Sequence, residues 1–547
     1  DVAFDVSSAR FLVCWERTYS SIDHDVWAQQ YDSNGVVIAG SGAYIDLTAT
    51  YWADPRVANN NIANNYEVVA TVGSAAPHSI WGRARDSSSV FMNPPVAISA
   101  EPSYDCIDPD VGGDPVTQGP TYYMVIWMRG VSGTDTDIHA QMLDGNGNPY
   151  GGLVLIDNSA STIDFEPAIS KSDGLAPYAT QNWTVTWTRQ FTFGVDYDIL
   201  GSQIRWDGTI SRPSYYIDYS VAYDYDSQAS TVLDGATGDR DYMVVYNRFN
   251  GVSDNNLHAR IFNGGAFVSD ADLSALDTDV ALDQIRPAVD SDGYNYAVAY
   301  SEQFGTSTFD YDMYVSTFTR VGSTIKVSEA HQLLDTSALQ DILPSIATQH
   351  SGGGSGPRSM VVWENYSSAG TDIDISGGVY ENVEFTGFCS PGIDALACPC
   401  GNPSSNYNSG CNNSSLTGGA HLSKTGAATL SGDSVVFTAI GEKPTATSIF
   451  LQGTTALPSG VIFGQGVRCA GGALKRLYVK SAVGGTVTAP TGGDPTVHVR
   501  SAALGDTILP GESRYYCVYY RDPIVLGGCP STSTFNSTQT GALIWLP

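Results

Sequence analysis

The strongest constraint on the fold is an internal repeat with a period near 60 residues. An apolar run that mostly ends in an aromatic residue, such as FLVCW or YMVIW, recurs along residues 1–385. Successive copies end at Trp15, Ala70, Trp127, Trp187, Tyr246, Tyr300 and Trp363, in steps of 55, 57, 60, 59, 54 and 63 residues. A unit of this length exceeds one hairpin and fits a sheet of four strands of about 5–10 residues each.

Each copy carries further landmarks in a constant order. A Pro-x-Val-Ala-like segment precedes the apolar run, as in DPRVA from Asp54, and Asp-x-Asp with an aliphatic residue follows it, as in DTDIHAQ from Asp135. Units that cannot bury their faces alone are expected to close radially, which removes most exposed strand edges. The sequence therefore predicts an all-β protein with a seven-bladed β-propeller over residues 1–385, and a linear solenoid is the alternative.

The composition of the sequence changes from residue 386 onward. Short runs in which apolar and polar residues alternate lie there among Gly, Ser and Thr. We expect about eight strands in a disulfide-rich β-sandwich over residues 386–547. Seven of the nine cysteines lie in this region: Cys389, Cys398, Cys400, Cys411, Cys469, Cys517 and Cys529. Such density predicts disulfides in an oxidising compartment, and the odd total leaves at least one thiol that is free or pairs between chains. Zinc bound by Cys398, Cys400 and Cys411 is the alternative.

Charge divides the chain in the same place. The whole sequence has 26 Lys and Arg against 57 Asp and Glu, a net charge of −31. Residues 1–385 hold 17 basic and 50 acidic residues, net −33, and residues 386–547 hold 9 and 7, net +2. Nucleic acid is excluded as a partner because it requires a basic face. No apolar run reaches the ~18 residues of a membrane helix. The chain opens at Asp1 without a leader, so we expect a processed, secreted protein, extracellular or at the cell surface.

The repeat resembles those of large secreted β-propeller proteins of planctomycetes and myxobacteria, and the copies at Pro55, Pro109, Pro167, Pro287 and Pro344 match best. The C-terminal region resembles a Cys-rich module of secreted planctomycete proteins, through Cys398-Pro399-Cys400-Gly401-Asn402, Gly410-Cys411-Asn412-Asn413-Ser414, Gly464-Gln465-Gly466-Val467-Arg468-Cys469, Tyr519-Tyr520-Arg521-Asp522-Pro523 and Phe535-Asn536-Ser537-Thr538. The resemblance implies a propeller fold and an extracellular setting. It implies no activity, because fold alone does not determine function.

The Asp-x-Asp pairs are the candidate metal ligands. They are Asp23 and Asp25, Asp135 and Asp137, Asp196 and Asp198, Asp310 and Asp312, and Asp372 and Asp374. Two carboxylates so close repel each other unless a cation or backbone donors offset the charge. We therefore predict calcium at these turns. The structural alternative is that each Asp accepts hydrogen bonds from backbone amides of the turn.

Aromatic residues provide the remaining binding candidates. Those that end the apolar runs are expected to pack between blades, whereas Tyr215, Tyr216, Tyr223 and Tyr225 lie outside that pattern and are the candidates for ligand contact. The sequence contains no His-Glu-x-x-His, no Gly-x-Ser-x-Gly and no phosphate-binding loop. A pair of carboxylates that cleaves a glycosidic bond can come from two different blades, and the sequence alone does not identify such a pair.

The sequence thus favours a non-enzymatic protein. Our primary prediction is an extracellular or cell-surface structural protein that assembles with copies of itself into a fibre or layer. Charge asymmetry, the odd cysteine and the absent catalytic motifs favour it. The alternative is a secreted propeller that binds carbohydrate or cleaves glycosidic bonds, with a glycan as its partner.

Overall fold

A computed structural model describes most of the chain. The residues outside this description are 117–118, 172–180, 193–195, 234–239, 252–253, 278–281, 293–294, 306–308, 322–323, 336, 338, 350–357, 367–372, 382–384, 388, 390, 392–394, 405–408, 426–427, 429, 431–432, 510–511, 527–528, 530–531 and 546–547. The chain forms two compact units. Unit 1 comprises Asp1–Thr319, Thr324–His350 and Arg358–Tyr380, and the main segment of unit 2 is Glu381–Pro547.

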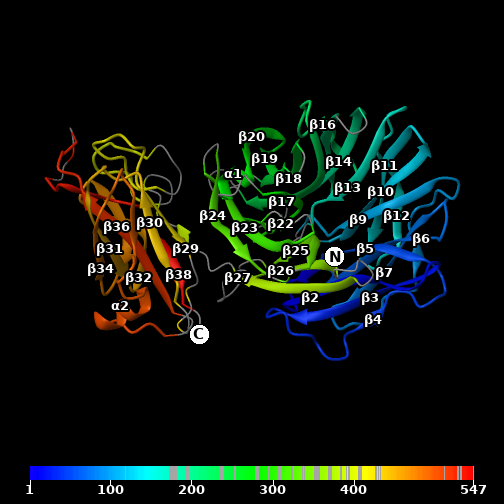
Figure 1. Ribbon diagram of the computed structural model, residues 1–547, viewed down its shortest axis with the longest axis horizontal. Helices are drawn as coiled ribbons and strands as arrows, with labels where there is room; N and C mark the ends of the chain where they lie inside the picture. The colour runs from blue at the N-terminus through cyan, green and yellow to red at the C-terminus, as the bar shows by residue number, and fades with distance from the viewer. Residues whose placement is uncertain are drawn as a thin grey trace. The chain divides into compact units, whose positions relative to one another are not determined.

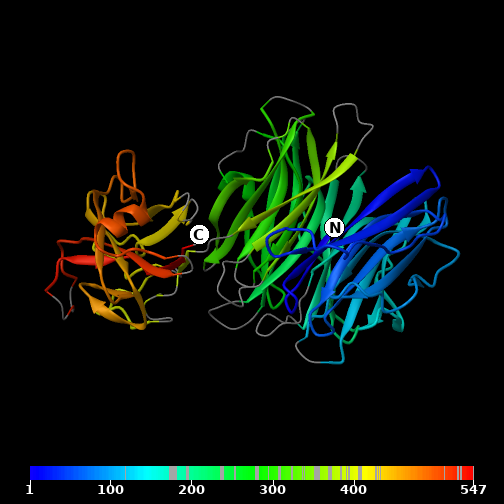
Figure 2. The same cartoon turned by 90° about the horizontal axis from the view of Figure 1, so that it is seen from below.

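Unit 1 is built almost entirely from antiparallel strands that recur in chain order (Figures 1 and 2). The first strands are β1 (Val2–Asp5), β5 (Trp52–Asn60), β9 (Asp105–Gly112), β13 (Ile163–Ile169), β17 (Tyr223–Leu233), β21 (Gln284–Ser291) and β25 (Gln340–Thr348). The second strands are β2 (Arg10–Ser20), β6 (Asn65–Val72), β10 (Tyr122–Ser132), β14 (Asn182–Thr192), β18 (Arg240–Gly251), β22 (Tyr296–Gln303) and β26 (Arg358–Tyr366).

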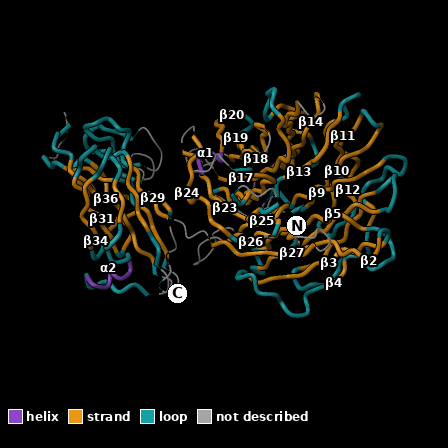
Figure 3. Tube along the Cα trace, in the orientation of Figure 1, coloured by secondary structure: helices purple, strands orange, loops and turns teal. Residues whose placement is uncertain are grey.

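The outer strands complete these groups. The third strands are β3 (Asp23–Asp32), β7 (Ser79–Asp86), β11 (Asp135–Asp144), β15 (Asp196–Arg205), β19 (Asp254–Asn263), β23 (Tyr311–Val321) and β27 (Ile373–Glu381). The fourth strands are β4 (Ala43–Tyr44), β8 (Val96–Ala97), β12 (Pro149–Asp157), β16 (Ile210–Tyr216), β20 (Ala266–Asp272) and β24 (Thr324–Leu333). The one-turn helix α1 (Leu273–Asp277) follows β20 (Figure 3).

The first strands lie next to one another in cyclic order. β1 contacts β5, and each later first strand contacts the next, until β25 contacts β1 again. The nearly all-β fold that the sequence predicts is confirmed. The strands from β9 to β20 also form one continuous 12-stranded sheet, since β11 pairs with β13 and β15 with β17 at single residues. The number of blades therefore stays a prediction, to which the cyclic contacts lend support.

The aromatic residues that end the apolar runs explain why these groups pack. Five of them are buried and Trp15 is half-buried; the five are Trp127, Trp187, Tyr246, Tyr300 and Trp363. They lie in clusters of side chains drawn from neighbouring groups, as Trp127 does with Ile80 and Val111. The prediction that these side chains pack between blades rather than face a ligand is consistent with this burial.

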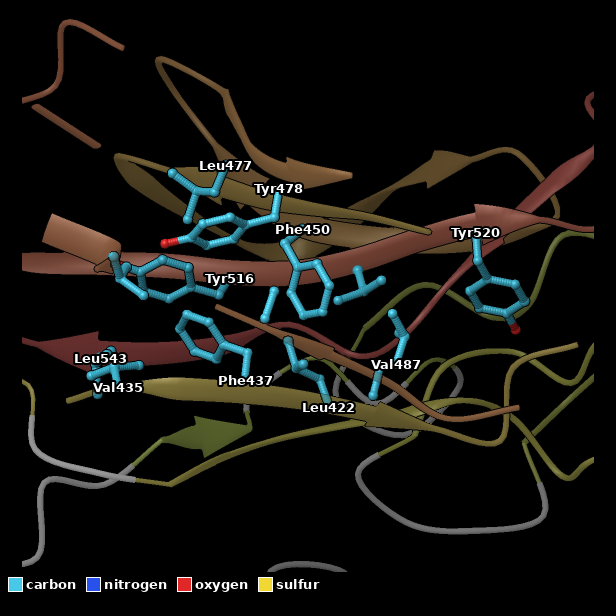
Figure 4. Packing of buried hydrophobic residues seen from close by; sticks show 14 of the residues in the cluster. Leu422, Val435, Phe437, Phe450, Leu477, Tyr478, Val487, Tyr516, Tyr520 and Leu543 are labelled. Atoms are coloured by element: carbon cyan, nitrogen blue, oxygen red, sulfur yellow. The ribbon is translucent and has the colours of Figure 1, made fainter. Parts of the chain in front are cut away.

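Unit 2 contains two sheets that share a core. A larger sheet is made by β28 (Thr386–Gly387), β31 (Thr447–Gly453), β34 (Lys475–Ser481), β36 (Ser513–Arg521), β37 (Phe535–Ser537) and β38 (Gly541–Ile544). A smaller one is made by β29 (His421–Thr425), β30 (Val436–Ile440) and β35 (Val487–Ala489), and β32 (Thr455–Phe463) forms a hairpin with β33 (Gly466–Gly471). Figure 4 shows Phe437 and Leu422 of the smaller sheet against Phe450 and Tyr516 of the larger. The helix α2 (Val497–Ala503) completes the unit.

Disulfides join parts of unit 2 that are distant in sequence. Cys389 pairs with Cys469, Cys398 with Cys411 and Cys400 with Cys529. These pairs use the cysteines of the zinc alternative, which is therefore wrong. Cys14, Cys106 and Cys517 are free and buried, so none is placed to pair between chains. The disulfides indicate an oxidising compartment. Among the described residues no helix combines the length and apolar character of a membrane span.

Candidate functional site

Near its start, nearly every first strand of unit 1 contains the same irregularity. Two residues are skipped in the pairing between first and second strand, and the first of the two has a left-handed backbone. These residues, here called the bulge positions, are Asp54 (φ 52°), Asp108 (51°), Glu166 (51°), Asp226 (51°), Arg286 (58°) and Leu343 (55°). Bulges of this kind redirect a side chain and often occur beside active sites.

The local sequence explains the bulge. Proline, which cannot donate to a strand partner, follows five of the six bulge positions, and serine follows Asp226. The proline or serine is mostly buried, whereas each bulge residue keeps some exposure. Because the first strands contact one another in order, equivalent positions on neighbouring strands lie close together. Four of the six carry a carboxylate, so the fold gathers acids from separate copies of the repeat at one end of the first strands.

Glu166 and Asp226 form the central pair of this group. The backbone N–H of Asp226 donates to Glu166 Oε2 at 3.4 Å, and Arg286 Nη1 donates to Asp226 Oδ1 at 2.7 Å. Burial, together with the charge of Asp226, raises the pKa of Glu166 to about 7. Burial also raises the pKa of Asp226, against the opposing charge of Arg286. The two carboxyl groups therefore titrate as a coupled pair, in which burial favours the protonated form of each and Arg286 opposes that effect.

Asp108 and Asp54 continue the acidic group on the preceding blades. Burial and the charge of Asp54 raise the pKa of Asp108 to about 6, and Glu166 adds to the effect. Arg56 lies near enough to oppose the rise. The pKa values of three neighbouring acids, Asp108, Glu166 and Asp226, are thus raised mainly by burial. Perturbed pKa values are typical of acids and bases at functional sites.

An aromatic wall adjoins the acid pair. We use this name for Phe165, Tyr197, Tyr223, Tyr225 and Phe249. Their ring centroids lie 5.7 Å apart for Phe165 and Tyr197, 4.2 Å for Tyr197 and Tyr223, 5.0 Å for Tyr223 and Tyr225, and 6.1 Å for Tyr223 and Phe249. Phe165 and Tyr225 directly precede Glu166 and Asp226 in sequence. Aromatic faces beside a few polar groups are typical of small-molecule sites.

The sequence analysis identified only part of this site. Tyr223 and Tyr225 do lie beside the acid pair, whereas Tyr215 packs under Arg212 and hydrogen-bonds Tyr242 at 2.7 Å, away from it. The bulge acids went unrecognised as a group, because they stand about 60 residues apart in the sequence. The sequence does contain one indication of them. The residue before the repeated proline or serine is acidic in four copies, whereas it is Arg286 and Leu343 in the last two.

The predicted metal ligands are not the bulge residues. Those that the structure describes lie within two residues of the first residue of a third strand. In four pairs the second aspartate is buried: Asp25, Asp137, Asp198 and Asp312. Asp135 accepts the backbone N–H of Ser161 at 2.8 Å and Asp198 that of Ser220 at 3.1 Å. Burial raises the pKa of Asp25, Asp137, Asp198 and Asp312, to about 6 in the last two. Asp23, Asp196 and Asp310 are partly exposed and Asp374 is exposed, while Asp372 lies outside the described residues.

Backbone N–H groups and arginines offset the negative charge of several of these carboxylates. Arg129 binds both Glu101 and Asp137 at 2.8 Å. Arg189 joins Asp157 to Asp164, and Arg248 joins Asp218 to Asp224, so each arginine ties the end of one group of strands to the start of the next. In the part of the chain that the structure describes, no cluster of three or more His, Cys, Asp or Glu residues could hold a metal ion. Calcium at the Asp-x-Asp pairs stays a prediction.

Comparisons with known proteins give distant similarity only. No family model matches the chain, and no curated protein does. An α-L-arabinanase of Penicillium chrysogenum, solved with arabinobiose, is 11% identical over 62% of this chain and 94% of its own, with a TM-score of 0.40. The α-L-arabinofuranosidase Arb93A of Fusarium graminearum is 9% identical over 60% and 93%, with a TM-score of 0.35. A sialidase of Trypanosoma rangeli is 10% identical over 100% and 94%, with a TM-score of 0.39.

These findings correct the primary prediction from the sequence. A structural protein that assembles into a fibre or layer finds no support in them, and this prediction is not carried further. The alternative prediction, a propeller that binds or cleaves carbohydrate, agrees better with them. A module shared with planctomycete proteins has no matching family model and stays a resemblance.

Proposed function

We propose that residues 1–385 form a seven-bladed β-propeller that binds carbohydrate at the bulge positions and cleaves a glycosidic bond there. The observation that carries the proposal is the acid pair. Glu166 titrates near neutral pH, beside Asp226, whose carboxyl group accepts a hydrogen bond from Arg286. Glycoside hydrolysis requires a carboxylic acid that protonates the leaving oxygen and a second carboxylate. The aromatic wall supplies a surface for the apolar face of a sugar ring.

The roles follow from the environments of the acids. Glu166 is the general acid, because its pKa of about 7 lies near the pH at which it acts. Asp226 carries the negative charge that raises this pKa, and Arg286 limits the rise. Asp108 is the candidate base, which takes a proton from the attacking water as Glu166 gives one to the leaving oxygen. The protein acts in an oxidising extracellular compartment, and the residues from 386 onward form a separate disulfide-stabilised domain.

The test is hydrolysis of a panel of chromogenic aryl glycosides and of neutral polysaccharides by the purified chain. Glu166→Gln keeps the shape of the side chain and removes the proton, so it should lower kcat by about 10²–10⁴-fold. Asp207→Asn is the matched control, because Asp207 lies in the exposed turn after β15 and accepts only from Thr209. Full activity in Glu166→Gln, or a chain that neither binds nor cleaves any glycan, would overturn the proposal.

A further inference from the structure

A second aromatic surface lies further out on the same end of unit 1. Phe191 is 46% exposed, Tyr216 46%, Tyr219 73% and Val221 90%. We call these four residues the rim patch. The ring centroids of Phe191 and Tyr216 are 6.4 Å apart, and those of Tyr216 and Tyr219 are 4.9 Å apart. So many exposed apolar side chains in one place mark an interaction surface.

The backbone under the rim patch is held firmly. Tyr219 and Val221 lie in the connection from β16 to β17, on either side of Ser220. Asp198 accepts the backbone N–H of Ser220 at 3.1 Å, and Asp224 accepts its hydroxyl at 3.2 Å. The N–H groups of Ile217 and Asp218 both bond to the carbonyl of Ile199. The exposed rings are thus presented by an ordered segment, which lowers the entropy lost on binding.

The rim patch continues into the aromatic wall. The connection that carries Tyr219 and Val221 runs directly into Tyr223, whose ring lies 4.2 Å from that of Tyr197. The carbonyl of Ala222 accepts the backbone N–H of Tyr197 at 3.3 Å. Aromatic side chains therefore extend from the acid pair outward over blades formed by β13–β16 and β17–β20. An extended sugar chain can contact both surfaces at once.

The charge of unit 1 distinguishes between the molecules that could bind the rim patch. Residues 1–385 carry a net charge of −33, so a second copy of unit 1 is repelled, and so is an anionic polymer. Three acids contact the segment under the patch or lie within it: Arg248 pairs with Asp218 and Asp224, and Asp198 binds the backbone N–H of Ser220. A neutral or amino-bearing sugar chain meets no such repulsion, and its C–H faces suit the exposed rings of Tyr216 and Tyr219.

We propose that the rim patch binds a polysaccharide of neutral or amino sugars and extends the contact of the acid pair with the same chain. The inference rests on the proposed function. It adds the substrate class: a polymer rather than a short or acidic saccharide. Loss of the rim patch weakens polymer binding and leaves the chemistry at Glu166 unchanged.

The experiment compares polymer binding with hydrolysis of a small substrate. Affinity electrophoresis of the full chain in gels that contain arabinan, xylan, laminarin, chitosan or polygalacturonate gives a dissociation constant for each polymer. Tyr219→Ala should raise this constant about tenfold for the neutral or amino polymer that binds, with unchanged kcat/KM on an aryl glycoside. Phe267→Ala is the matched control, because Phe267 is 55% exposed on the edge strand β20 and should have no effect.

Four results would overturn the inference. They are unchanged polymer affinity in Tyr219→Ala, stronger binding to polygalacturonate than to the other polymers, equal losses for polymer and aryl glycoside, and a wild-type dimer in sedimentation velocity that Tyr219→Ala dissolves. Failure of the proposed function has a different signature. Glu166→Gln would then hydrolyse as fast as wild type, whatever the behaviour of Tyr219→Ala.

Discussion

At the scale of single residues, Glu166 shows how surroundings assign a chemical task. Its backbone conformation is the one that Asp54, Asp108 and Asp226 also adopt. Its proton affinity differs because it is buried beside Asp226, with Arg286 opposing the effect. Because Glu166 must be protonated and Asp108 ionised to act, activity should be highest between pH about 6 and about 7 and fall on either side.

Arg286→Ala tests this dependence. Arg286 lowers the pKa of Glu166, so its removal raises that pKa. The alkaline limb of the kcat/KM profile should therefore move to higher pH, by up to about one unit. Arg212→Ala serves as the control, since Arg212 stacks on Tyr215 and binds Tyr242 instead. A limb that stays in place or moves downward would remove Glu166 from the acid role.

Glu442 in unit 2 gives a second residue-scale prediction, on stability. Burial raises the pKa of Glu442 to about 8, although Ser448 donates a hydrogen bond to it. The folded state therefore holds a proton that the unfolded state releases near pH 4.5, the ordinary pKa of a glutamate. The free energy of unfolding should fall as pH rises from about 4.5 to 8, by at most about 1.4 kcal/mol per pH unit.

Glu442→Gln should abolish this decline, because glutamine does not titrate, and it should stabilise the protein at pH 8. Denaturant unfolding at several pH values measures the effect. Glu512→Gln is the control. The backbone N–H of Leu509 and the charge of Arg514 lower the pKa of Glu512, so it has no such decline to lose. An identical pH slope in Glu442→Gln and wild type would contradict the assignment.

At the scale of elements, the repeated bulge is the device that places the site. A left-handed backbone strains a residue with a side chain by about 1–2 kcal/mol. Six first strands accept this conformation at the same place, among them β25 with the apolar Leu343. The strain therefore belongs to the strand and not to the chemistry of any one side chain.

Substitution of Leu343 measures that strain. Leu343→Gly should leave stability unchanged or raise it by up to about 1 kcal/mol, because glycine adopts the left-handed conformation freely. Leu343→Val should cost about 1–2 kcal/mol, since a β-branched residue does not. Leu155→Gly in β12 is the control, because Leu155 has no left-handed backbone, and it should lose about 1 kcal/mol. Equal effects of glycine and valine at residue 343 would show that no strain is stored there.

The elements also show how far the sequence alone could reach. Strand periodicity and the spacing of Trp127, Trp187 and Tyr246 predicted an all-β fold, because burial of one residue per copy leaves a visible period. The contacts of Glu166 with Asp226 could not be predicted, since they depend on strand order and on a bulge. The Asp-x-Asp pairs stood out because they are adjacent in sequence, yet Asp137 and Asp198 bind an arginine and a backbone amide.

At the scale of the whole molecule, the two units depend on different sources of stability. Unit 1 relies on packing between its groups of strands and has no disulfide, since Cys14 and Cys106 are free. Unit 2 has three disulfides, which span 13, 80 and 129 residues. Each crosslink restricts the unfolded chain and contributes roughly 2–5 kcal/mol.

Reduction should therefore act on one unit only. Calorimetry should resolve two unfolding transitions. A reductant should lower the midpoint temperature of the unit 2 transition and leave that of unit 1 unchanged. Limited proteolysis followed by mass spectrometry identifies the affected transition, because the fragments lost first should come from residues 386–547. Two transitions that move together would mean that the units unfold as one.

The bulge has an evolutionary consequence. Because proline and strand pairing set the backbone, the side chain at each bulge position can vary, and the chain already carries Asp, Glu, Arg and Leu at equivalent places. Duplicated copies could diverge there one residue at a time without refolding the scaffold. A few substitutions at the bulge positions would therefore change which ligand this end of unit 1 prefers. These positions are residues 54, 108, 166, 226, 286 and 343.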